Sequence, residues 1–370
     1  MSNGSRREPG VGLALSGGGF RATLFHLGSL WRLNELGWLP KLTVITSVSG
    51  GSIAAGVLAH RWKNLRFDNN GVAANFTDEM ETPLRRFCAR NIDVLAGLVG
   101  MLPGVSGGDV VAYRYKKYLF GDATLQDLPS GANIPRFLFY ATSLQTGASV
   151  RITKEYLADY KVGQWPSPTL PLAMAVAASS AFPPVLSPLI IKTDASRWQD
   201  MPGTRFFGDE RYRSRLILTD GGVYDNLGLE AIWDRYETVL VSDAGAPLAP
   251  DPGASGAWAN LTVRVLDILT DQTRALRKRR LIEDFKSNVR HGTYWGITTH
   301  IDDYQLSDAI TKDSDLTAAL KEMRTRLNEF SAEEQGRLIN WGYALTDAAM
   351  RKHVLNGGAP GRWPDPNHRL

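Results

Sequence analysis

Three short motifs in the chain combine small residues with side chains that are able to react. The first is Ser47-Val48-Ser49-Gly50-Gly51, which lies between a β-branched stretch and a stretch with helical spacing. Small residues two positions before and after Ser49 allow a sharp turn, and such a strand-to-helix turn presents a serine hydroxyl as a nucleophile. The usual pattern is G-x-S-x-G, and Ser47 replaces its first glycine here. Because serine is also small, we expect the turn to form and Ser49 to be a candidate nucleophile.

The second motif is a run of glycines, Gly17-Gly18-Gly19, followed by Phe20 and Arg21. Successive glycines can direct several backbone N–H groups at one point, which the oxyanion of an acyl-transfer intermediate requires. A phosphate-binding loop is the rival interpretation, but the run matches neither G-x-x-x-x-G-K-[ST] nor G-x-G-x-x-G. We therefore expect Gly17, Gly18 and Gly19 to form an oxyanion hole, and we expect no bound nucleotide.

The third motif is Asp220 followed by two glycines, directly after a predicted strand over residues 216–219. Taken alone, this motif indicates a turn. Beside a nucleophilic serine, however, its carboxylate could approach the hydroxyl without crowding and accept the proton. Asp225 and Asp243 are the competing acids, and we expect Asp225 to stabilise the turn that follows it. A calcium site built from Asp220, Asp225 and their neighbours is the remaining alternative, but the spacing is not that of an EF-hand loop, so we expect no metal site.

Six histidines are present, so a Ser-His-Asp triad has to be considered. A triad histidine is expected in a loop that follows a hydrophobic strand after the acid, and none of the six has this context. His26 lies a little over one helical turn beyond Arg21, where we expect a packed, hydrogen-bonded role near the glycine run. A carboxylate is a weak base unless it is desolvated or hydrogen-bonded to the serine. We therefore favour a dyad of Ser49 and Asp220.

Alternating strand and helix patterns position these motifs. An apolar stretch at residues 11–15 leads through the glycine run into helical spacing over residues 21–36, and a strand at residues 42–46 leads through Ser49 into a helix over residues 53–62. Two consecutive strand-turn-helix units predict a parallel sheet with its turns at one edge. The remaining predicted elements are a helix of small residues over 172–179 and strands at 136–142, 149–153, 216–219 and 238–242.

The chain becomes more charged and helical after about residue 260, with helical spacing over residues 263–289 and 315–351. Neither a Pro/Ser-rich linker nor an internal repeat separates this part from the rest. We expect three regions: a catalytic core over residues 1–260, a helical C-terminal segment packed on the core over residues 261–356, and a poorly ordered Gly- and Pro-rich tail over residues 357–370.

The three motifs, in this order and at these intervals, resemble the patatin-like phospholipase family. The family pattern is a glycine loop G-G-G-x-R, an elbow G-x-S-x-G and a D-G-G motif. The likeness covers about residues 11–246, because three further stretches are similar to bacterial members: residues 120–128, 178–185 and 220–228. Two positions depart from the pattern, Ser47 in the elbow and Ala22, where the family usually has glycine. Both are small residues, so we do not interpret them as inactivating.

The resemblance implies a three-layer α/β/α fold with a mostly parallel central sheet and a helical C-terminal extension. It implies that Ser49 is the nucleophile, that Asp220 is its base and that the glycine loop holds the oxyanion. Arg21 would brace that loop or bind a phosphate of the substrate. The implied activity is hydrolysis of acyl esters of membrane phospholipids through an acyl-enzyme that releases free fatty acid, without a cofactor. The alternatives are a non-catalytic lipid-binding scaffold and an effector that degrades membranes only after a signal.

Charge and cysteine content restrict the partners. Lys and Arg outnumber Asp and Glu by 42 to 38, a mild excess that gives no basis for nucleic-acid binding but allows contact with anionic lipid surfaces. The densest basic stretch, residues 274–280, is expected to be a solvated helix face or a patch that faces headgroups or a partner. Cys88 is the single cysteine, and the N-terminus lacks a secretory pattern. We therefore expect a cytoplasmic location with peripheral membrane contact.

Three uncharged stretches raise the question of a membrane span: residues 42–59, 94–108 and 162–191. Each contains Gly or Pro in its middle, which would leave backbone groups unsatisfied in a bilayer, so none is expected to cross one. For the stretch from Val94 to Met101 we keep two interpretations: a lid or membrane-contacting loop, or part of the packed core.

Overall fold

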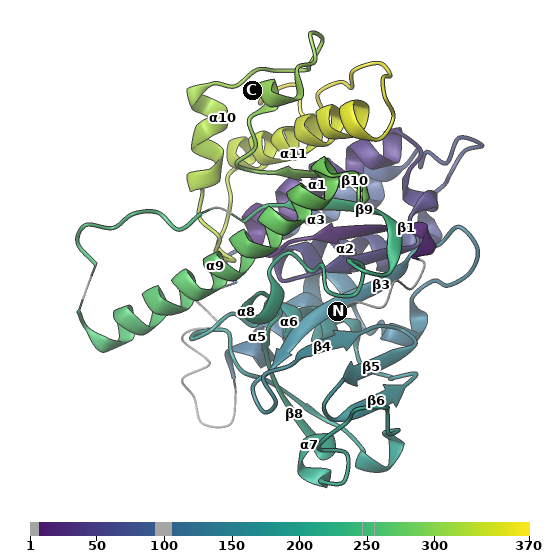
Figure 1. Cartoon of the computed structure of the whole chain (residues 1–370), viewed down its shortest axis with the longest axis vertical. Coiled ribbons are helices and arrows are strands. Elements are labelled where there is room, and N and C mark those ends of the chain that lie inside the picture. The colour runs from purple at the N-terminus through teal and green to yellow at the C-terminus, as the bar shows by residue number, and fades with distance from the viewer. Residues whose placement is uncertain (1–6, 93–105, 246, 255) are drawn as a thin grey trace.

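The computed structural model describes residues 7–92, 106–245, 247–254 and 256–370 (Figure 1). Residues 94–101, for which a lid and a core role are both open, lie outside the described residues. None of the helices in the described ranges combines the length and the apolar character that crossing a bilayer requires.

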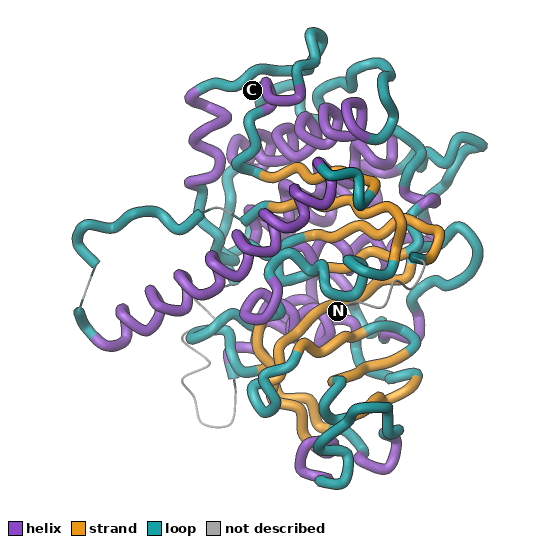
Figure 2. The backbone as a smooth tube through the Cα atoms, viewed as in Figure 1, coloured by secondary structure: helices purple, strands orange, loops and turns teal. Residues whose placement is uncertain are grey.

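Ten strands form a single sheet in the described part of the chain, drawn in orange in Figure 2. Five neighbouring strands are parallel, in the spatial order β10 (His291–Gly296), β9 (Tyr236–Asp243), β1 (Glu8–Leu15), β2 (Val44–Ser47) and β3 (Arg136–Ser143). The others are antiparallel to their neighbours: β4 (Ser149–Ile152), β5 (Tyr156–Asp159) and β6 (Gly163–Pro166) continue from β3, and β7 (Leu189–Lys192) pairs with β8 (Arg215–Asp220). The expected parallel centre of the sheet is therefore present.

The six strands that the sequence predicts are β1, β2, β3, β4, β8 and β9, and each is present within a few residues of its predicted bounds. Four strands are not predicted: β5, β6, β7 and β10. The first three have only four residues each. In β6 the strand Gly163–Pro166 contains both glycine and proline, which are depleted in strands. These strands form because a neighbouring edge is available, which a local pattern does not reveal.

The longer helices follow the predicted spacing. Described helices are α1 (Gly19–Glu35), α2 (Gly50–Arg61), α3 (Thr82–Cys88), α5 (Gly107–Tyr115), α6 (Leu172–Ser180), α7 (Glu210–Ser214), α8 (Gly222–Asp225), α9 (Trp258–Lys286), α10 (Asp315–Ala319) and α11 (Ala332–His353). Two of these helices begin directly after a parallel strand, at the glycine loop and at Ser49. The expected strand-turn-helix units are thus confirmed.

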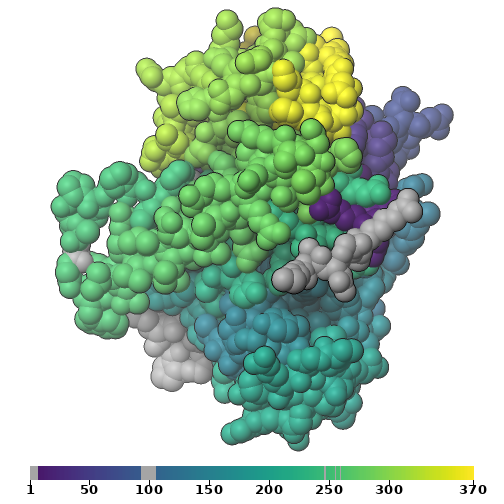
Figure 3. Space-filling view, in the orientation of Figure 1, coloured from purple at the N-terminus to yellow at the C-terminus, as the bar shows by residue number. Residues whose placement is uncertain are grey.

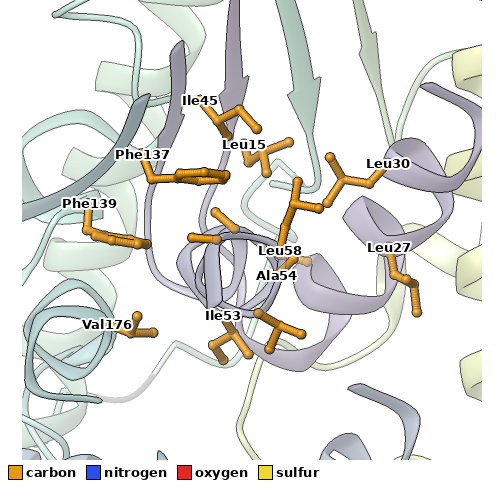
Figure 4. Close-up of a cluster of buried hydrophobic side chains, with 14 of the residues drawn as sticks. Leu15, Leu27, Leu30, Ile45, Ile53, Ala54, Leu58, Phe137, Phe139 and Val176 are labelled. Atoms are coloured by element: carbon orange, nitrogen blue, oxygen red, sulfur yellow. The ribbon is translucent and has the colours of Figure 1, made fainter. Parts of the chain in front are cut away.

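One face of the sheet carries the larger hydrophobic core. Side chains of β1, β2 and β3 point toward α1, α2 and α6, as Figure 4 shows for Leu15 and Ile45 over Leu58 and for Phe139 next to Val176. In a strand alternate residues face the same side, so this face is formed by every second residue. The core thereby supports the two turns from which α1 and α2 begin.

α11 packs on the outer side of α1 (Figure 1). The two backbones approach closely because glycine faces the partner helix on both sides. A Cβ at Gly28 would lie 2.8 Å from the amide nitrogen of Tyr343, and a Cβ at Gly342 would lie 2.8 Å from the carbonyl carbon of Phe25. The C-terminal helix is therefore part of the layer that holds the glycine loop.

A smaller core covers the opposite face of the sheet. Ala14, Val239 and Val241 point to this face, where residues 227–233 and Leu281 of α9 cover them. Helices and a connecting segment thus enclose both faces of the sheet. The three-layer α/β/α arrangement expected from the family resemblance is confirmed.

The C-terminal segment adds more than helices. β10 pairs in parallel with β9 and extends the sheet at that edge. The single helix pattern over residues 315–351 is divided into α10 and α11, because α11 begins at a capping box in which Ser331 and Glu334 bond each other's backbone N–H. The boundary near residue 260 between core and C-terminal segment remains a prediction.

The sequence leads us to expect a poorly ordered tail over residues 357–370, and the structure corrects this expectation. Asp365 is buried and forms an ion pair with Arg85, with 2.9 Å between Oδ2 and Nη2. Asn340 of α11 donates hydrogen bonds of 2.8 Å to the carbonyl oxygens of Asp365 and His368. Trp363 and Leu370 also pack against the larger hydrophobic core. These contacts involve residues far away in the chain, so the Gly- and Pro-rich composition of the tail did not reveal them.

Candidate active site

Two strands that run in opposite directions end side by side on the same edge of β3. β2 is parallel to β3 and ends with Ser47 opposite Phe139. β8 is antiparallel to β3 and ends with Asp220 opposite Ala141, only two residues further along. β4 occupies the other edge of β3. The residues that follow β2 and the last residue of β8 therefore meet, although about 170 residues separate them in the chain.

Ser49 lies at the turn between β2 and α2, in a backbone conformation with φ 52° and ψ −120°. Non-glycine residues rarely adopt a positive φ, and such strained turns occur at nucleophiles. The N–H of Ser49 donates to the carbonyl oxygen of Ser179 at 3.1 Å and to its hydroxyl at 3.0 Å, which holds the turn. A Cβ at Gly51 would lie 2.5 Å from the carbonyl oxygen of Leu15, so only glycine fits there.

Ser47, which departs from the G-x-S-x-G pattern, is accommodated by hydrogen bonds. Its hydroxyl accepts from the Ser52 hydroxyl at 2.9 Å and donates to the carbonyl oxygen of Leu138 at 3.3 Å. Both groups are buried. The additional hydroxyl is therefore satisfied rather than a source of strain, and the turn keeps the conformation of an elbow.

Asp220 is buried at the end of β8, with 1% of its surface exposed. Its Oδ1 accepts a hydrogen bond of 2.7 Å from the N–H of Gly222. Burial raises the pKa of this carboxyl to about 7, although the Gly222 N–H and the Ser49 hydroxyl both favour the charged form. Among the described residues Oδ2 has no hydrogen-bond partner. The Ser49 hydroxyl is thus close enough to favour the charged carboxylate, but its geometry is too loose for a complete hydrogen bond. Catalytic hydrogen bonds are often long or poorly aligned when no substrate is bound.

The two competing acids are engaged elsewhere. Asp225 accepts hydrogen bonds from the N–H groups of Leu227 at 3.1 Å and Leu229 at 2.8 Å, so it stabilises the turn as expected. Asp243 accepts from Arg274 at 2.9 Å and from the Tyr294 hydroxyl at 2.8 Å. Burial disfavours the charge of Asp243, but these partners lower its pKa overall. Neither carboxylate is available as a base.

The glycine loop lies beside Ser49 at the start of α1. A Cβ at Gly17 would lie 3.1 Å from the Cβ of Ser49, so the absence of a side chain permits this approach. The N–H of Gly17 donates to the carbonyl oxygen of Asn226 at 3.1 Å. By contrast, within the described residues the N–H groups of Gly18 and Gly19 have no acceptor. Free N–H groups are therefore present at Gly18 and Gly19 but not at Gly17. Of the three glycines expected to form the oxyanion hole, these two have an N–H group available.

Arg21 points into the protein from α1. Its Nη1 donates to the carbonyl oxygens of Lys321 and Met323, and its Nη2 donates to that of Ala244, all at 2.8 Å. Burial lowers the pKa of its guanidinium to about 10. Of the two roles that the sequence left open, bracing the loop fits this arrangement, because backbone carbonyl groups already occupy both terminal nitrogens.

His26 is fully buried on α1 behind the glycine loop. Its Nε2 donates to the carbonyl oxygen of Ser16 at 2.9 Å, so Nδ1 accepts from the Ser242 hydroxyl at 2.9 Å. Burial lowers the pKa of His26 to about 4, and the ring is neutral. The expected packing role is thus confirmed. In the described part of the chain no histidine lines the pocket at Ser49, and no His/Cys/Asp/Glu group could hold a metal ion.

Ser49, Asp220 and the glycine loop line one pocket of about 710 Å³. Phe182, Val185 and Leu186 form an apolar wall. Two further walls come from the C-terminal segment and are not predicted from the sequence: one face of α9, and residues 321–327. No motif marks either wall, because their pattern is that of ordinary charged helical segments.

The chain is similar to several solved structures. Human GIVD cytosolic phospholipase A2 has a TM-score of 0.50 and 14% sequence identity, over 93% of this chain and 61% of that chain. VipD from Legionella pneumophila has a TM-score of 0.38 and 15% identity, over 92% of this chain and 66% of that chain. At this identity the likeness to the human structure concerns the fold alone, and our chain spans 61% of the human chain.

The sequence comparison is more specific. No curated protein sequence matches the chain. A family model described as patatin-like phospholipase matches residues 13–233, more than half of the chain. The matched region contains the glycine loop, Ser49 and Asp220, which the fold brings to one pocket. The chain therefore belongs to the patatin-like phospholipase family.

Proposed function

We propose that the protein is a lipid acyl hydrolase that cleaves phospholipids through a dyad of Ser49 and Asp220. The observation that carries the proposal is the meeting of a serine on a strained turn with a buried carboxylate whose pKa is raised to about 7. A carboxyl group with an ordinary pKa near 4 is a poor base toward a serine hydroxyl, whereas a base is most effective when its pKa is near the working pH. Membership of the family supports the reaction class.

The reaction proceeds in two steps. The Oγ of Ser49 attacks the acyl carbonyl carbon while its proton moves to Asp220. The negative charge that develops on the carbonyl oxygen is stabilised by the free N–H groups of Gly18 and Gly19 and by the N-termini of α1 and α2. Asp220 then protonates the leaving alcohol oxygen, which gives an acyl-enzyme. In the second step Asp220 deprotonates a water molecule, which attacks the carbonyl carbon of this ester. The bond to Oγ breaks, Asp220 returns the proton to Oγ of Ser49, and the fatty acid is released.

The pocket supports an acyl substrate with a charged head. Its apolar wall and volume of about 710 Å³ suit part of an acyl chain, since ligand pockets commonly have ~300–1,000 Å³. Lys321 and Arg326 line the same pocket, and in the described residues neither side chain has an ion-pair or hydrogen-bond partner. Unpaired cations at the pocket favour a phosphate group. We therefore place phospholipids before neutral lipids as substrates.

Replacing both cations by glutamine tests this preference. The double variant Lys321→Gln/Arg326→Gln is expected to lower kcat/KM for phosphatidylglycerol in mixed micelles by about tenfold to a hundredfold, because charged hydrogen bonds contribute ~1.5–3 kcal/mol. The rate on a diacylglycerol in the same micelles should fall far less. Glu322→Gln in the same segment is the matched control, since it removes an anion instead and should not lower the phospholipid rate. An equal loss on both lipids would refute the headgroup assignment.

Active-site labelling tests the nucleophile. A fluorophosphonate probe should label the purified protein, and mass spectrometry should locate the adduct on Ser49. Vesicles of phosphatidylcholine and phosphatidylglycerol should release fatty acid at a rate that labelling abolishes. A lipid-binding scaffold would show neither labelling nor release. An enzyme that needs a signal would stay unlabelled and inactive until cell extract is added.

A further inference from the structure

α9 has its apolar face toward solvent. Six large apolar residues of this helix are between 42% and 80% exposed: Trp258, Leu261, Val265, Ile268, Leu269 and Leu276. Their separations are mostly three and four residues, which places them on one side of a helix. We call these six residues the α9 outer face. It extends over 19 residues, with about 27 Å between its first and last residue.

The opposite face of α9 is polar and lines the pocket. Asp267, Thr270, Asp271 and Arg274 belong to the pocket wall. Arg274 pairs there with Asp243 at 2.9 Å and with Asp271 at 3.0 Å. A surface helix of a soluble protein normally has its apolar face inward and its polar face outward, and α9 reverses this order from Trp258 to Leu276. Beyond this part, Leu281 faces the core in the usual way. An exposed apolar stripe of this kind indicates an interaction surface.

The outer face lies at the edge of the pocket. In Figure 1 the N-terminal half of α9 projects beyond the sheet, and in Figure 3 the helix runs across the surface of the molecule. Because the same helix lines the pocket with one face and exposes the other, whatever covers the outer face is held beside the pocket.

Charge decides which occupant fits. Arg279 and Arg280 are exposed one turn beyond Leu276 and continue the same side of the helix. The two acidic residues between Trp258 and Arg280, Asp267 and Asp271, line the pocket instead. A second copy of the helix would bring two more arginines to the outer face and no carboxylate to pair with them. An anionic lipid surface supplies both hydrocarbon for the stripe and phosphate for the arginines.

We propose that the α9 outer face docks the protein on an anionic lipid surface, with its six apolar residues among the acyl chains and Arg279 and Arg280 at the headgroups. Docking would bring the pocket to the level of the ester bonds of the lipid. The proposal rests on the proposed function for its biological sense, because a lipid substrate lies in such a surface. Binding itself requires no catalysis, so the two can be tested separately.

Vesicle sedimentation tests the docking. The experiment uses the Ser49→Ala protein, so that vesicles stay intact, and vesicles of phosphatidylcholine with and without phosphatidylglycerol. The additional pair Leu261→Asp/Leu269→Asp should weaken partitioning onto the anionic vesicles by at least about tenfold, because both side chains would otherwise leave water. The matched control is Leu144→Asp/Tyr160→Asp, which alters residues that are 55% and 52% exposed, lie outside α9 and do not line the pocket. This variant should bind like the parent.

A fluorescent label locates the contact. Cys88 is the only cysteine, it is buried, and burial raises its pKa, so a cysteine introduced at Val265 can be labelled selectively. An environment-sensitive dye at position 265 should shift to the blue with anionic vesicles, and a dye at position 160 should not. Arg279→Gln/Arg280→Gln should reduce the difference between anionic and neutral vesicles.

Three results would overturn the docking proposal: no sedimentation of the parent with anionic vesicles, unchanged sedimentation of Leu261→Asp/Leu269→Asp, or a dimer in sedimentation velocity that this pair dissociates. Hydrolysis of a water-soluble p-nitrophenyl ester by the otherwise wild-type Leu261→Asp/Leu269→Asp protein separates this failure from that of the proposed function. That rate should equal the wild-type rate, because neither leucine lines the pocket.

Discussion

Ser49→Ala is expected to lower kcat for a p-nitrophenyl acyl ester by about 10⁴- to 10⁶-fold while the fold stays intact, since removal of a nucleophile disables the catalytic group as a unit. The physical reason is that, among the described residues that line the pocket, no other hydroxyl combines a strained turn with the Asp220 carboxylate. Ser180 is the matched control, because it also lines the pocket and is buried. Its hydroxyl donates to the carbonyl oxygen of Val176 at 2.9 Å. Ser180→Ala should keep most of the activity.

Stability measurements separate catalysis from folding at this position. The φ of 52° at Ser49 is strained for a residue with a side chain. Ser49→Gly should therefore raise the free energy of unfolding by about 1 kcal/mol relative to Ser49→Ala, while both variants are inactive. Chemical denaturation and ester hydrolysis of the two variants together check this expectation. Wild-type hydrolysis by Ser49→Ala would eliminate the proposed nucleophile.

Asp220→Asn is expected to lower kcat/KM by about 10³-fold or more, because an amide cannot accept the Ser49 proton. In the wild type the base must be ionised, and its pKa is about 7. The activity should therefore rise with pH through about 7 and then level off. A pH profile of kcat/KM on a soluble ester, measured from pH 5 to 9, reports this group in the free enzyme. An activity that is flat over this range would contradict the assignment of Asp220 as base.

The same substitution should increase stability at alkaline pH. The pKa of Asp220 is higher in the folded protein than its ordinary value of 3.8, so the folded state holds the proton more tightly than the unfolded state does. Stability from this group is therefore greatest below pH 4 and declines until about pH 7. The loss is on the order of 4 kcal/mol at most, from ~1.4 kcal/mol for each pH unit between the two pKa values.

Asp220→Asn lacks this titration. Its free energy of unfolding should exceed that of the wild type at pH 8, and the difference should shrink at pH 5.5. Denaturant titrations at both pH values measure it. Asp243→Asn is the contrasting control, since the pKa of Asp243 is lowered and its buried partner Arg274 would lose a charge partner. That variant should be less stable than the wild type at pH 8.

Much of the architecture is visible in the sequence because local patterns encode it. The elbow around Ser49 and the glycine loop both lie between a β-branched or apolar stretch and a helical stretch, and both turns form where predicted. Six strands and the long helices follow their apolar periodicity. Short strands such as β6 and the ion pair that holds the tail at Asp365 cannot be predicted from a local pattern. Both depend on neighbours that are distant in the chain.

The sequence by itself determined which residues carry reactive groups: a serine in a tight turn, an aspartate beside two glycines, and a run of glycines. Only the tertiary structure decided how they meet. β2 and β8 pair with the same edge of β3 from opposite directions, so that their C-terminal ends meet and Asp220 lies near Ser49. Burial at this point raises the pKa of the Asp220 carboxyl. The hydrogen bond from Gly17 to Asn226 leaves only Gly18 and Gly19 free, and the fold turns the apolar face of α9 outward. Strand pairing, desolvation and helix orientation arise between segments far apart in the chain, so no local pattern contains them.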